Sequence, residues 1–334
     1  MRIIAGQFKG RSLITMKDKS IRPTTDRVKE SIFNLLQGYV EDANVLDLFA
    51  GSGALGIEAL SRGAKSVTFA DRSNDSIETI NTNLKKVSGK INVIRKDFLT
   101  TIDYLSARKE KFDIIFLDPP YKQGLEKIAI DKIEECDILA QDGIIVVERS
   151  REDEPLVLTS GYRAITIRDY GSVTVMLVQK ATACAITGTF DPFTLGHKYL
   201  VEKGLENFDE VHVVVLVNPD KQTELPPTKR VKLIETSVRR MGGVVKVAYY
   251  EGLAIDYCKE NDIQYIIRGI RNEKDFEYEK EMATWNKENG DVNTLLIPAE
   301  DAEISSTIVR EKIKKGDDLS GLVDEEILLE LLRR

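Results

Sequence analysis

Asp118, Pro119, Pro120 and Tyr121 form the group of residues in this sequence with the clearest chemical use. They follow the apolar run Phe112–Leu117, which is typical of a buried strand. Two prolines fix the backbone, so the Asp118 carboxylate and the Pro119 carbonyl become rigid acceptors and the Tyr121 ring offers a stacking surface. Such acceptors suit the exocyclic amine of a planar base, because taking up its N–H hydrogens localises the nitrogen lone pair for attack on a methyl sulfonium. The group therefore predicts methyl transfer to an amino group.

A glycine-rich turn earlier in the chain is the candidate site for the methyl donor. Three glycines ending at Gly56 match GxGxxG after a predicted strand, and such a loop lets a ligand approach bare backbone. Asp71 ends the next strand, where a carboxylate can hold ribose hydroxyls, and Asp97 follows the third strand near the expected place of an adenine. The turn alone also fits a dinucleotide, but a hydride-transferring enzyme has no use for the Asp118 group. The cofactor-binding candidates are Asp47, Gly51, Gly53, Asp71 and Asp97.

A second group of residues, suited to phosphate, lies in the C-terminal half. Thr194 suits a helix N-cap, and His197 then stands at the helix N-terminus, where free N–H groups and the dipole favour an anion. Further candidates end strands or open a helix: Lys221, Arg268, Arg271, Ser305, Ser306 and Thr307. Together they predict a polyphosphate bridged by Mg²⁺, with direct transfer rather than a covalent intermediate. The alternatives are a surface histidine and ordinary surface ion pairs.

The elements that must position these groups are strands and helices in alternation. Continuous apolar runs between helical patterns are typical of parallel strands buried on both faces, so the N-terminal half predicts a doubly wound α/β sheet. A short β region at residues 2–14 and a helix near residues 25–36 precede this sheet, and two strands around residues 170–172 complete it. The alternation then restarts. We expect two Rossmann-like α/β domains, at residues 1–181 (with an N-terminal β extension) and 182–334.

Charge separates the two halves of the 334-residue chain, whose net charge is −7. Residues 1–30 hold eight basic and three acidic side chains, whereas residues 181–334 hold 21 basic and 29 acidic ones. A basic N-terminal arm indicates a polyanionic partner for the first domain, although a solvated surface is the alternative. The acidic second half argues against nucleic acid as its ligand.

Composition excludes several classes of protein. The hydrophobic fraction of 42% excludes a mainly disordered chain, and we find neither a membrane-spanning apolar run nor the long apolar centre of a signal peptide. Cys136, Cys184 and Cys258 lie far apart, which predicts reduced thiols and a cytoplasmic protein. With two histidines in all, a histidine-rich metal site is excluded, and no metal ligand is assigned to a protein side chain.

The N-terminal half resembles the bacterial small-subunit (16S) ribosomal RNA guanine-N2 methyltransferases. The matching segments are residues 2–6, 9–11, 22–34 and 46–60, and the resemblance extends to about residue 179. It implies S-adenosylmethionine as cofactor, catalysis by Asp118, Pro119 and Tyr121, and an RNA substrate. Candidates for RNA contact are Arg2, Lys9, Arg11, Arg22 and Arg27, of which Arg22 and Arg27 could equally pair with nearby carboxylates. Two alternatives stay open: a DNA adenine-N6 methyltransferase, and an inactive module that only docks RNA.

From about residue 183 the chain resembles bacterial phosphopantetheine adenylyltransferase, of the Rossmann-like nucleotidyltransferases. The matching segments are residues 188–192, 194–197, 268–271, 275–279, 304–307 and 320–323. The resemblance implies transfer of AMP from ATP to 4′-phosphopantetheine, which gives dephospho-coenzyme A and pyrophosphate. Thr187 and Leu195 depart from the family, which commonly has proline and asparagine there.

The same resemblance assigns roles to the phosphate-suited residues. His197 and Thr194 would stabilise the transition state, while Lys221, Arg268 and Arg271 clamp the phosphates. The binding candidates are Thr189, Phe190, Asp191, His197, Lys221, Arg268, Gly269, Arg271, Glu279, Ser305, Ser306 and Thr307. Relatives form hexamers, so a homo-oligomer is expected. Aromatic residues in the predicted helix at residues 275–287 would then belong to the core or to a subunit contact.

Overall fold

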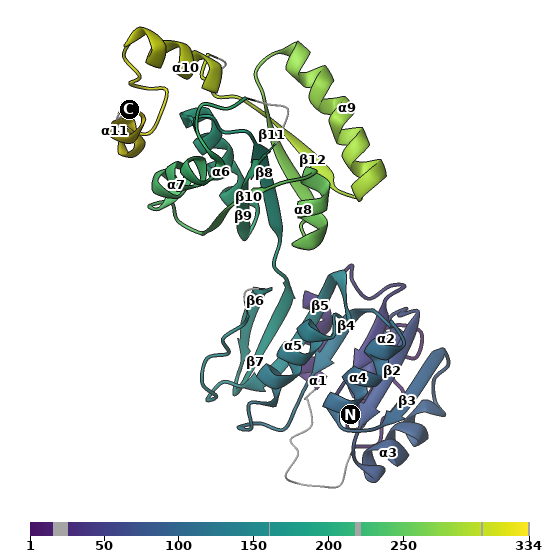
Figure 1. Cartoon of the computed structure of the whole chain (residues 1–334). Coiled ribbons are helices and arrows are strands. Elements are labelled where there is room, and N and C mark those ends of the chain that lie inside the picture. The colour runs from purple at the N-terminus through teal and green to yellow at the C-terminus, as the bar shows by residue number, and fades with distance from the viewer. Residues whose placement is uncertain (16–25, 160, 218–221, 302, 333–334) are drawn as a thin grey trace. The chain divides into compact units, whose positions relative to one another are not determined.

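The structure, a computed structural model, describes residues 1–15, 26–159, 161–217, 222–301 and 303–332 (Figure 1). The chain divides into two compact units, Met1–Lys180 and Ala181–Arg334. Each unit contains its own sheet and its own buried apolar clusters. The predicted class, two Rossmann-like α/β folds, is confirmed.

The N-terminal unit is built on a seven-stranded sheet in the order β3-β2-β1-β4-β5-β7-β6. Its strands are β1 (Asn44–Asp47), β2 (Ser66–Asp71), β3 (Lys90–Arg95), β4 (Phe112–Leu117), β5 (Leu139–Ser150), β6 (Tyr162–Tyr170) and β7 (Val173–Lys180). The first five are parallel, and β7 pairs antiparallel with both β5 and β6. Strand order reverses between β1 and β4, and ligands bind at the carboxyl ends of strands at such a switch point.

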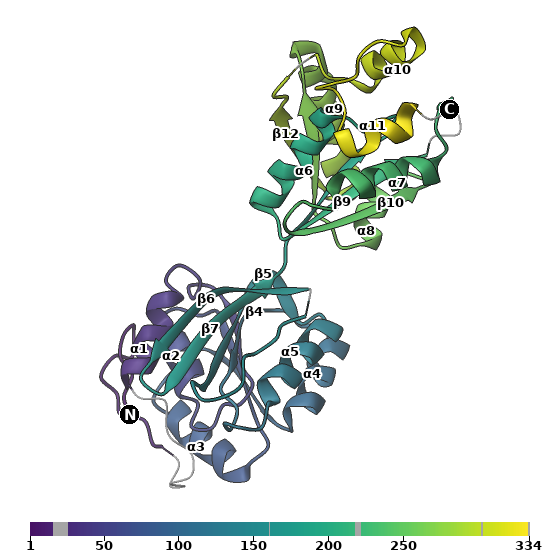
Figure 2. The ribbon, with the colours of Figure 1, turned by 90° about the vertical axis from the view of Figure 1, so that its left-hand side faces the viewer.

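Helices cover both faces of this sheet (Figures 1 and 2). They are α1 (Asp26–Leu35), α2 (Ala54–Ser61), α3 (Asn74–Leu84), α4 (Phe98–Ala107) and α5 (Leu125–Glu135). One apolar cluster joins the sheet to α1, α2 and α3, and a second joins it to α4 and α5. Ile114 and Phe116 of β4 belong to the first cluster, and Ile115 and Leu117 to the second. Each such fully buried side chain stabilises the fold by roughly 1.5–3 kcal/mol, which explains the continuous apolar runs.

The predicted β region at residues 2–14 differs from expectation. Among the described residues it contains one isolated bridge, between Arg2 and Ser12, and no strand. The segment folds back on itself, because the Ile3 N–H donates to the Arg11 carbonyl (3.0 Å). Its turn docks on α2, where the Gln7 N–H donates to the carbonyl of Ser61 (2.7 Å). A Cβ at Gly6 would lie 1.7 Å from that same oxygen, so only glycine allows this approach.

The C-terminal unit contains a five-stranded parallel sheet in the order β10-β9-β8-β11-β12. Its strands are β8 (Ala183–Gly188), β9 (Glu210–Leu216), β10 (Val244–Tyr250), β11 (Tyr265–Ile270) and β12 (Asn293–Pro298). Its helices are α6 (Leu195–Asn207), α7 (Pro227–Val238), α8 (Ala254–Glu260), α9 (Glu273–Gly290), α10 (Ser306–Lys315) and α11 (Glu325–Leu332). The switch point lies between β8 and β11, so a second ligand site is expected at their carboxyl ends.

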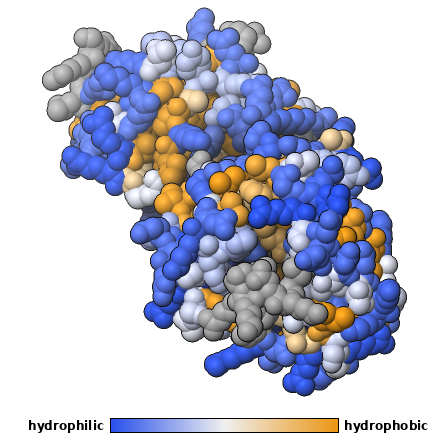
Figure 3. Space-filling view, turned by 90° about the horizontal axis from the view of Figure 1, so that it is seen from below, coloured by the Kyte–Doolittle hydropathy of each residue, from blue (hydrophilic) through white to orange (hydrophobic). Residues whose placement is uncertain are grey.

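The aromatic residues of α9 are exposed rather than buried. Phe276, Tyr278 and Trp285 have exposed fractions of 40%, 59% and 39%. These exposed fractions contradict the core part of the expectation, and the other part, a subunit contact, stays a prediction. Figure 3 shows that hydrophilic residues cover most of the face that it draws, with hydrophobic residues in separate patches. Among the described helices, none is long and apolar enough to cross a membrane.

Candidate functional site

The glycine turn of the N-terminal unit lies over a buried carboxylate. Asp47 ends β1 and is 2% exposed, and its Oδ2 accepts a hydrogen bond from the Gly56 N–H (3.0 Å). Burial raises the pKa of Asp47 to about 7; the Gly56 hydrogen bond opposes this shift, while the nearby carboxylates of Asp118 and Asp71 add to it. The structure thus brings three predicted site residues together at the carboxyl edge of the sheet. Asp47 thus holds the last glycine of the GxGxxG motif in place through its hydrogen bond to the Gly56 N–H.

The turn itself combines glycines with a second aspartate. Gly51 and Gly53 have φ of +52° and +78°, which favours glycine. At Gly51 a Cβ would meet nothing within 4 Å, so open space lies next to the backbone there. Asp71 holds the turn, because its Oδ2 accepts from the Gly51 N–H (2.9 Å) and its Oδ1 from the Ser73 N–H (2.8 Å). A ligand could approach this rigid loop closely.

In the structure, the Asp97 side chain contacts the first turn of the helix that follows it. It is the N-cap of α4, and its carboxylate accepts hydrogen bonds from the Thr100 N–H (3.0 Å) and hydroxyl (2.6 Å). These bonds to Thr100 lower the pKa of Asp97, because they favour the charged form. The side chain remains exposed, and its predicted contact with a cofactor stays a prediction.

The Asp-Pro-Pro-Tyr group lies at the end of β4. Leu117 is in register with Val147 of β5, so Asp118, the next residue, lies beside Glu148. The Tyr121 hydroxyl donates to Glu148 Oε1 (3.1 Å), and Glu148 is 2% exposed. Sequence reasoning missed Glu148. The available signal was a glutamate that interrupts the apolar run 143–147 at its carboxyl end.

Four basic side chains of the N-terminal arm are exposed, whereas Lys29, in the same arm, is fully buried. Arg2 lies 3.8 Å from the Asp26 carboxylate, and the Arg11 guanidinium donates to the Lys86 carbonyl. The exposed candidates for RNA contact are Arg2, Lys9, Arg11 and Arg27. Arg22 lies outside the described residues, as does Lys221 of the second site. RNA contacts by this arm stay a prediction.

In the C-terminal unit, His197 has a defined hydrogen-bonding state. The Thr194 N–H lies 3.0 Å from His197 Nδ1, and an amide can only donate, so Nδ1 accepts and the neutral ring carries its hydrogen on Nε2. The Phe190 and Phe193 rings lie against the imidazole, with centroid distances of 4.9 and 5.5 Å. Burial, together with the cations of Arg271 and Arg268, lowers the pKa of His197 to about 3. The histidine is therefore a neutral hydrogen-bond donor at the start of α6.

Arg268 is held by a carboxylate. Its Nε and Nη2 donate to the two oxygens of Glu279 (2.9 and 2.8 Å), and Nη1 donates to the Thr187 carbonyl. Glu279 is largely buried on α9, so its contact in the structure is with Arg268. Arg271, by contrast, follows β11 and is exposed. Glu279 thus orients the guanidinium of Arg268, whereas the guanidinium of Arg271 is open to solvent.

The loop that contains Thr189, Phe190 and Asp191 is fixed from several directions. Asp191 is buried, and its carboxylate accepts from the N–H groups of Glu224 (2.9 Å) and Leu225 (3.1 Å). The Thr189 carbonyl accepts from Arg230, a buried residue of α7 that sequence reasoning missed. No feature of the local sequence distinguished this arginine. Asp191 stabilises the loop, and its predicted place near the attacking phosphate stays a prediction.

The hydroxyl residues at the start of α10 lie close to this loop. Ser305 caps α10 by accepting from the Ile308 N–H (3.2 Å), and the Ser306 hydroxyl donates to the Pro192 carbonyl (2.9 Å). The ideal Cβ position of Gly196 is 3.7 Å from the Ile304 carbonyl oxygen, so the N-termini of α6 and α10 are neighbours. Two helix N-termini at one sheet edge favour a phosphate-rich ligand. Thr307 is exposed there, and Gly269 lies on β11.

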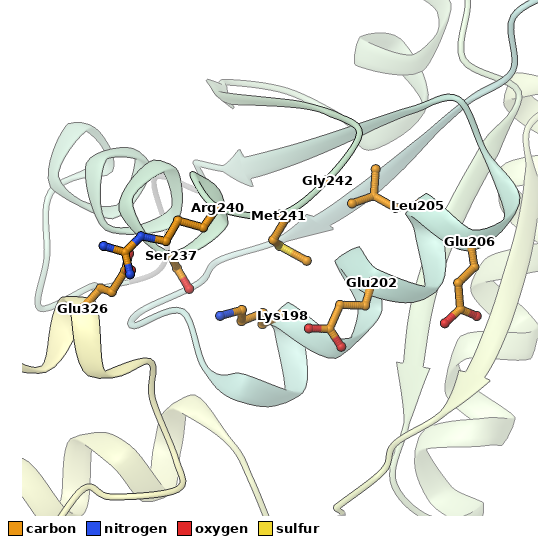
Figure 4. Close-up of a pocket in the computed structure, with 9 residues that line it drawn as sticks. All are labelled: Lys198, Glu202, Leu205, Glu206, Ser237, Arg240, Met241, Gly242 and Glu326. Atoms are coloured by element: carbon orange, nitrogen blue, oxygen red, sulfur yellow. The ribbon is translucent and has the colours of Figure 1, made fainter.

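A groove of about 730 Å³ lies elsewhere in the C-terminal unit, between α6, the end of α7 and the start of α11 (Figure 4). Its lining contains none of the predicted site residues. Two of its cations are neutralised, because Lys198 pairs with Asp324 and Arg240 with Glu326 (2.8 Å).

Across the described parts of the chain, no cluster of three or more His, Cys, Asp or Glu residues is placed to hold a metal.

Comparisons with known proteins divide the chain in the same way. The family described as conserved hypothetical protein 95 matches residues 1–179, and the cytidylyltransferase-like family matches residues 185–312. The Bacillus subtilis protein YlbH, whose name describes it as a candidate rRNA methyltransferase, is 44% identical over 183 residues, which cover 54% of this chain and 99% of YlbH. Ribosomal RNA small subunit methyltransferase D of Haemophilus influenzae is 37% identical over 184 residues (54% of this chain, 93% of that protein).

A different relative matches the C-terminal unit. Phosphopantetheine adenylyltransferase of Phocaeicola vulgatus is 41% identical over 140 residues, which cover 41% of this chain and 92% of that protein. The chain therefore belongs to the conserved hypothetical protein 95 family, with a methyltransferase domain that resembles small-subunit methyltransferase D, and this domain is fused to a member of the phosphopantetheine adenylyltransferase family.

Proposed function

We propose that residues 1–181 methylate the exocyclic N2 of a guanine in small-subunit ribosomal RNA, and that residues 182–334 transfer AMP from ATP to 4′-phosphopantetheine. The observation that carries the first activity is the cluster of Asp118, the fixed Tyr121 and the open glycine turn at one switch point. The second rests on the neutral His197 at a helix N-terminus beside Arg268 and Arg271.

The methyltransferase site fits S-adenosylmethionine. Gly51 leaves space beside a backbone that Asp71 holds rigid, which suits close approach of a nucleoside-containing ligand. The cofactor supplies an electrophilic methyl group when bound. Asp118 and the Pro119 carbonyl accept the two N2 hydrogens of the guanine, so its nitrogen lone pair points at the methyl group. Asp118 would take the proton that the nitrogen loses as the new N–C bond forms and the bond from the methyl group to the sulfonium breaks.

The adenylyltransferase site works by position and charge. His197 donates from Nε2 to a phosphate oxygen, and Arg268 and Arg271 neutralise the charge that develops as the acceptor phosphate attacks the α-phosphorus. The bond to the leaving pyrophosphate breaks as the new P–O bond forms. Mg²⁺ would enter with ATP. Lys221, Ser306 and Thr307 complete the proposed phosphate and nucleotide contacts.

The first experiment is methyl transfer from labelled S-adenosylmethionine to small ribosomal subunits that lack the modification, with the product base identified. We expect N2-methylguanine, because Asp118 accepts from an exocyclic amine. Methylation of bare duplex DNA at adenine N6 would favour the DNA-directed alternative. Absence of any transfer, in a preparation that makes dephospho-coenzyme A, would favour a module that only docks RNA.

The exposed aromatic residues of α9 bear on the oligomeric state of the protein. We propose a cytoplasmic homo-oligomer that assembles through α9, a helix next to the edge strand β12. Tyr278 and Trp285, seven residues apart, are exposed on one side of this helix, and Phe276 is exposed on the other side. Exposed aromatic side chains of this kind are enriched at protein interfaces.

A further inference from the structure

Glu148 is a buried carboxylate next to the proposed base site, and the proposed reaction does not use it. It lies on β5 one residue past Val147, which is in register with Leu117 of β4. On the other side of the strand, Glu148 is in register with Val175 of β7. A strand paired on both sides is a rigid support. Glu148 is therefore fixed beside Asp118 by the centre of the sheet.

One contact of Glu148 reaches across 27 residues of chain to Tyr121, whose hydroxyl donates to Glu148 Oε1 (3.1 Å). Tyr121 itself lies in a turn after two prolines, outside any helix or strand. The prolines fix the backbone but do not determine where the far end of the ring points. The hydrogen bond to Glu148 fixes the position of that end of the ring, because it holds the Tyr121 hydroxyl against β5.

Stability alone does not explain a glutamate at this position. The four residues before it, 144–147, are apolar and buried, and an apolar residue would continue the run without the cost of desolvating a carboxylate. Burial of a charged group costs several kcal/mol unless its contacts compensate. A carboxylate placed where it holds a residue of the reaction site is therefore expected to serve the reaction.

We propose that Glu148 is a positioning residue that fixes the Tyr121 ring, so that the target guanine stacks with its N2 amine at Asp118. This inference rests on the proposed methylation of guanine. In general, RNA affinity comes mainly from phosphate contacts, and the proposed cofactor site lies at the glycine turn. Loss of the Glu148 contact should therefore lower kcat, which depends on orientation, and leave both affinities nearly unchanged.

The test compares Glu148→Ala, Glu148→Gln, Tyr121→Phe and the double variant Glu148→Ala/Tyr121→Phe in the full chain, with unmodified small subunits as substrate. We expect Glu148→Ala and Tyr121→Phe each to lower kcat by about 10–100-fold, because each removes the same hydrogen bond. The double variant should be no slower than the slower single variant, since contacting residues are non-additive. Glu148→Gln keeps an Oε1 acceptor and should restore kcat to within about threefold of the parent protein.

Two controls separate positioning from loss of structure. Glu152→Ala removes an exposed glutamate that pairs with Lys122 (3.4 Å), the neighbour of Tyr121, and should change kcat by less than about twofold. Adenylyl transfer by the same preparation reports the amount of intact protein. If Glu148→Ala does not fold, Tyr121→Phe still removes the hydrogen bond between Tyr121 and Glu148, and it changes the less buried of the two residues.

The inference fails if Glu148→Ala and Tyr121→Phe keep the parent kcat. It also fails if they act on the KM for subunits or on the affinity for S-adenosylhomocysteine instead, or if Glu148→Gln is as slow as Glu148→Ala while Tyr121→Phe is fast. Failure of the proposed function is distinguishable, because then the parent protein itself does not methylate guanine in small subunits.

Discussion

His197 is a neutral donor because its surroundings oppose the imidazolium from two sides. The Thr194 N–H already points at Nδ1, so a proton there would face another donor. Burial and the cations of Arg271 and Arg268 then disfavour the charged ring. The sign of the effect on stability follows: because the folded pKa lies below the unfolded value, the unfolded chain binds the proton more tightly. Stability contributed by His197 is present above pH 6.5 and is lost as pH falls towards 3.

The chain contains two histidines, so this state of His197 can be measured directly by NMR of protein with isotope-labelled histidine. We expect one imidazole to keep constant shifts between pH 8 and pH 5 and to show the Nε2–H tautomer, because Nδ1 accepts from Thr194. His197→Asn, which removes one of the two signals, assigns it. A His197 signal that titrates near pH 6.5 would contradict the assignment.

At the scale of elements, the N-terminal arm and the glycine turn are joined through α3. Asn83 is fully buried on this helix, and its Nδ2 donates to the carbonyls of Ile14 (2.9 Å) and Ser52 (3.0 Å), while its Oδ1 accepts from the Ile14 N–H (2.8 Å). The arm is also anchored on α2, because the buried Glu58 carboxylate accepts from the Ile4 N–H (2.8 Å) and pairs with Lys29 (3.1 Å). One amide side chain thus links the basic arm to the proposed cofactor loop.

Asn83→Asp tests this link without a change of size. The substitution replaces two donated hydrogen bonds by a carboxylate that faces two carbonyl oxygens, a change of about 1–3 kcal/mol. We expect the affinity for S-adenosylhomocysteine, measured by calorimetry, to fall by about tenfold or more. Asn81→Asp makes the same change on the exposed side of α3 and should leave the affinity unaltered. Equal behaviour of the two variants would show that the Ser52 contact does not support the loop.

At the scale of the whole molecule, two separately built units are joined by a short connection. Lys180, the last residue of the first unit, pairs with Asp137 (2.7 Å) within that unit. Thr182 donates to Asp209 (2.7 Å) within the second unit. Each unit also has its own buried clusters, so the proposed activities depend on separate cores.

Separate cores predict separable activities. Asp118→Ala should lower methyl transfer by about 100-fold or more and leave adenylyl transfer within about twofold, because it removes the proposed acceptor of the N2 hydrogens. His197→Ala should have the opposite effect, since it removes a donor to the developing charge. Both rates are measured on each preparation, so each activity is the control for the other. A single substitution that lowers both rates equally would show that the units act together.

The sequence by itself determined the α/β class and the place of each motif. The apolar run Phe112–Leu117 is observed as a strand with these bounds, because a buried strand needs a continuous apolar run. The apolar runs placed Asp71 and Asp118 at the ends of two strands, and the effects of both carboxylates on the pKa of Asp47 indicate that the three side chains lie close together.

Only the tertiary structure decided which side chains hold those motifs in place. The hydrogen-bond partners of Glu148, Asn83 and Arg230 lie 27, up to 69 and 41 residues away in the chain. The same reason explains the N-terminal segment, which bonds to Ser61 of α2 instead of forming the predicted β region. Local patterns record burial and periodicity, whereas a hydrogen-bond partner depends on strand order and on which helix covers which face.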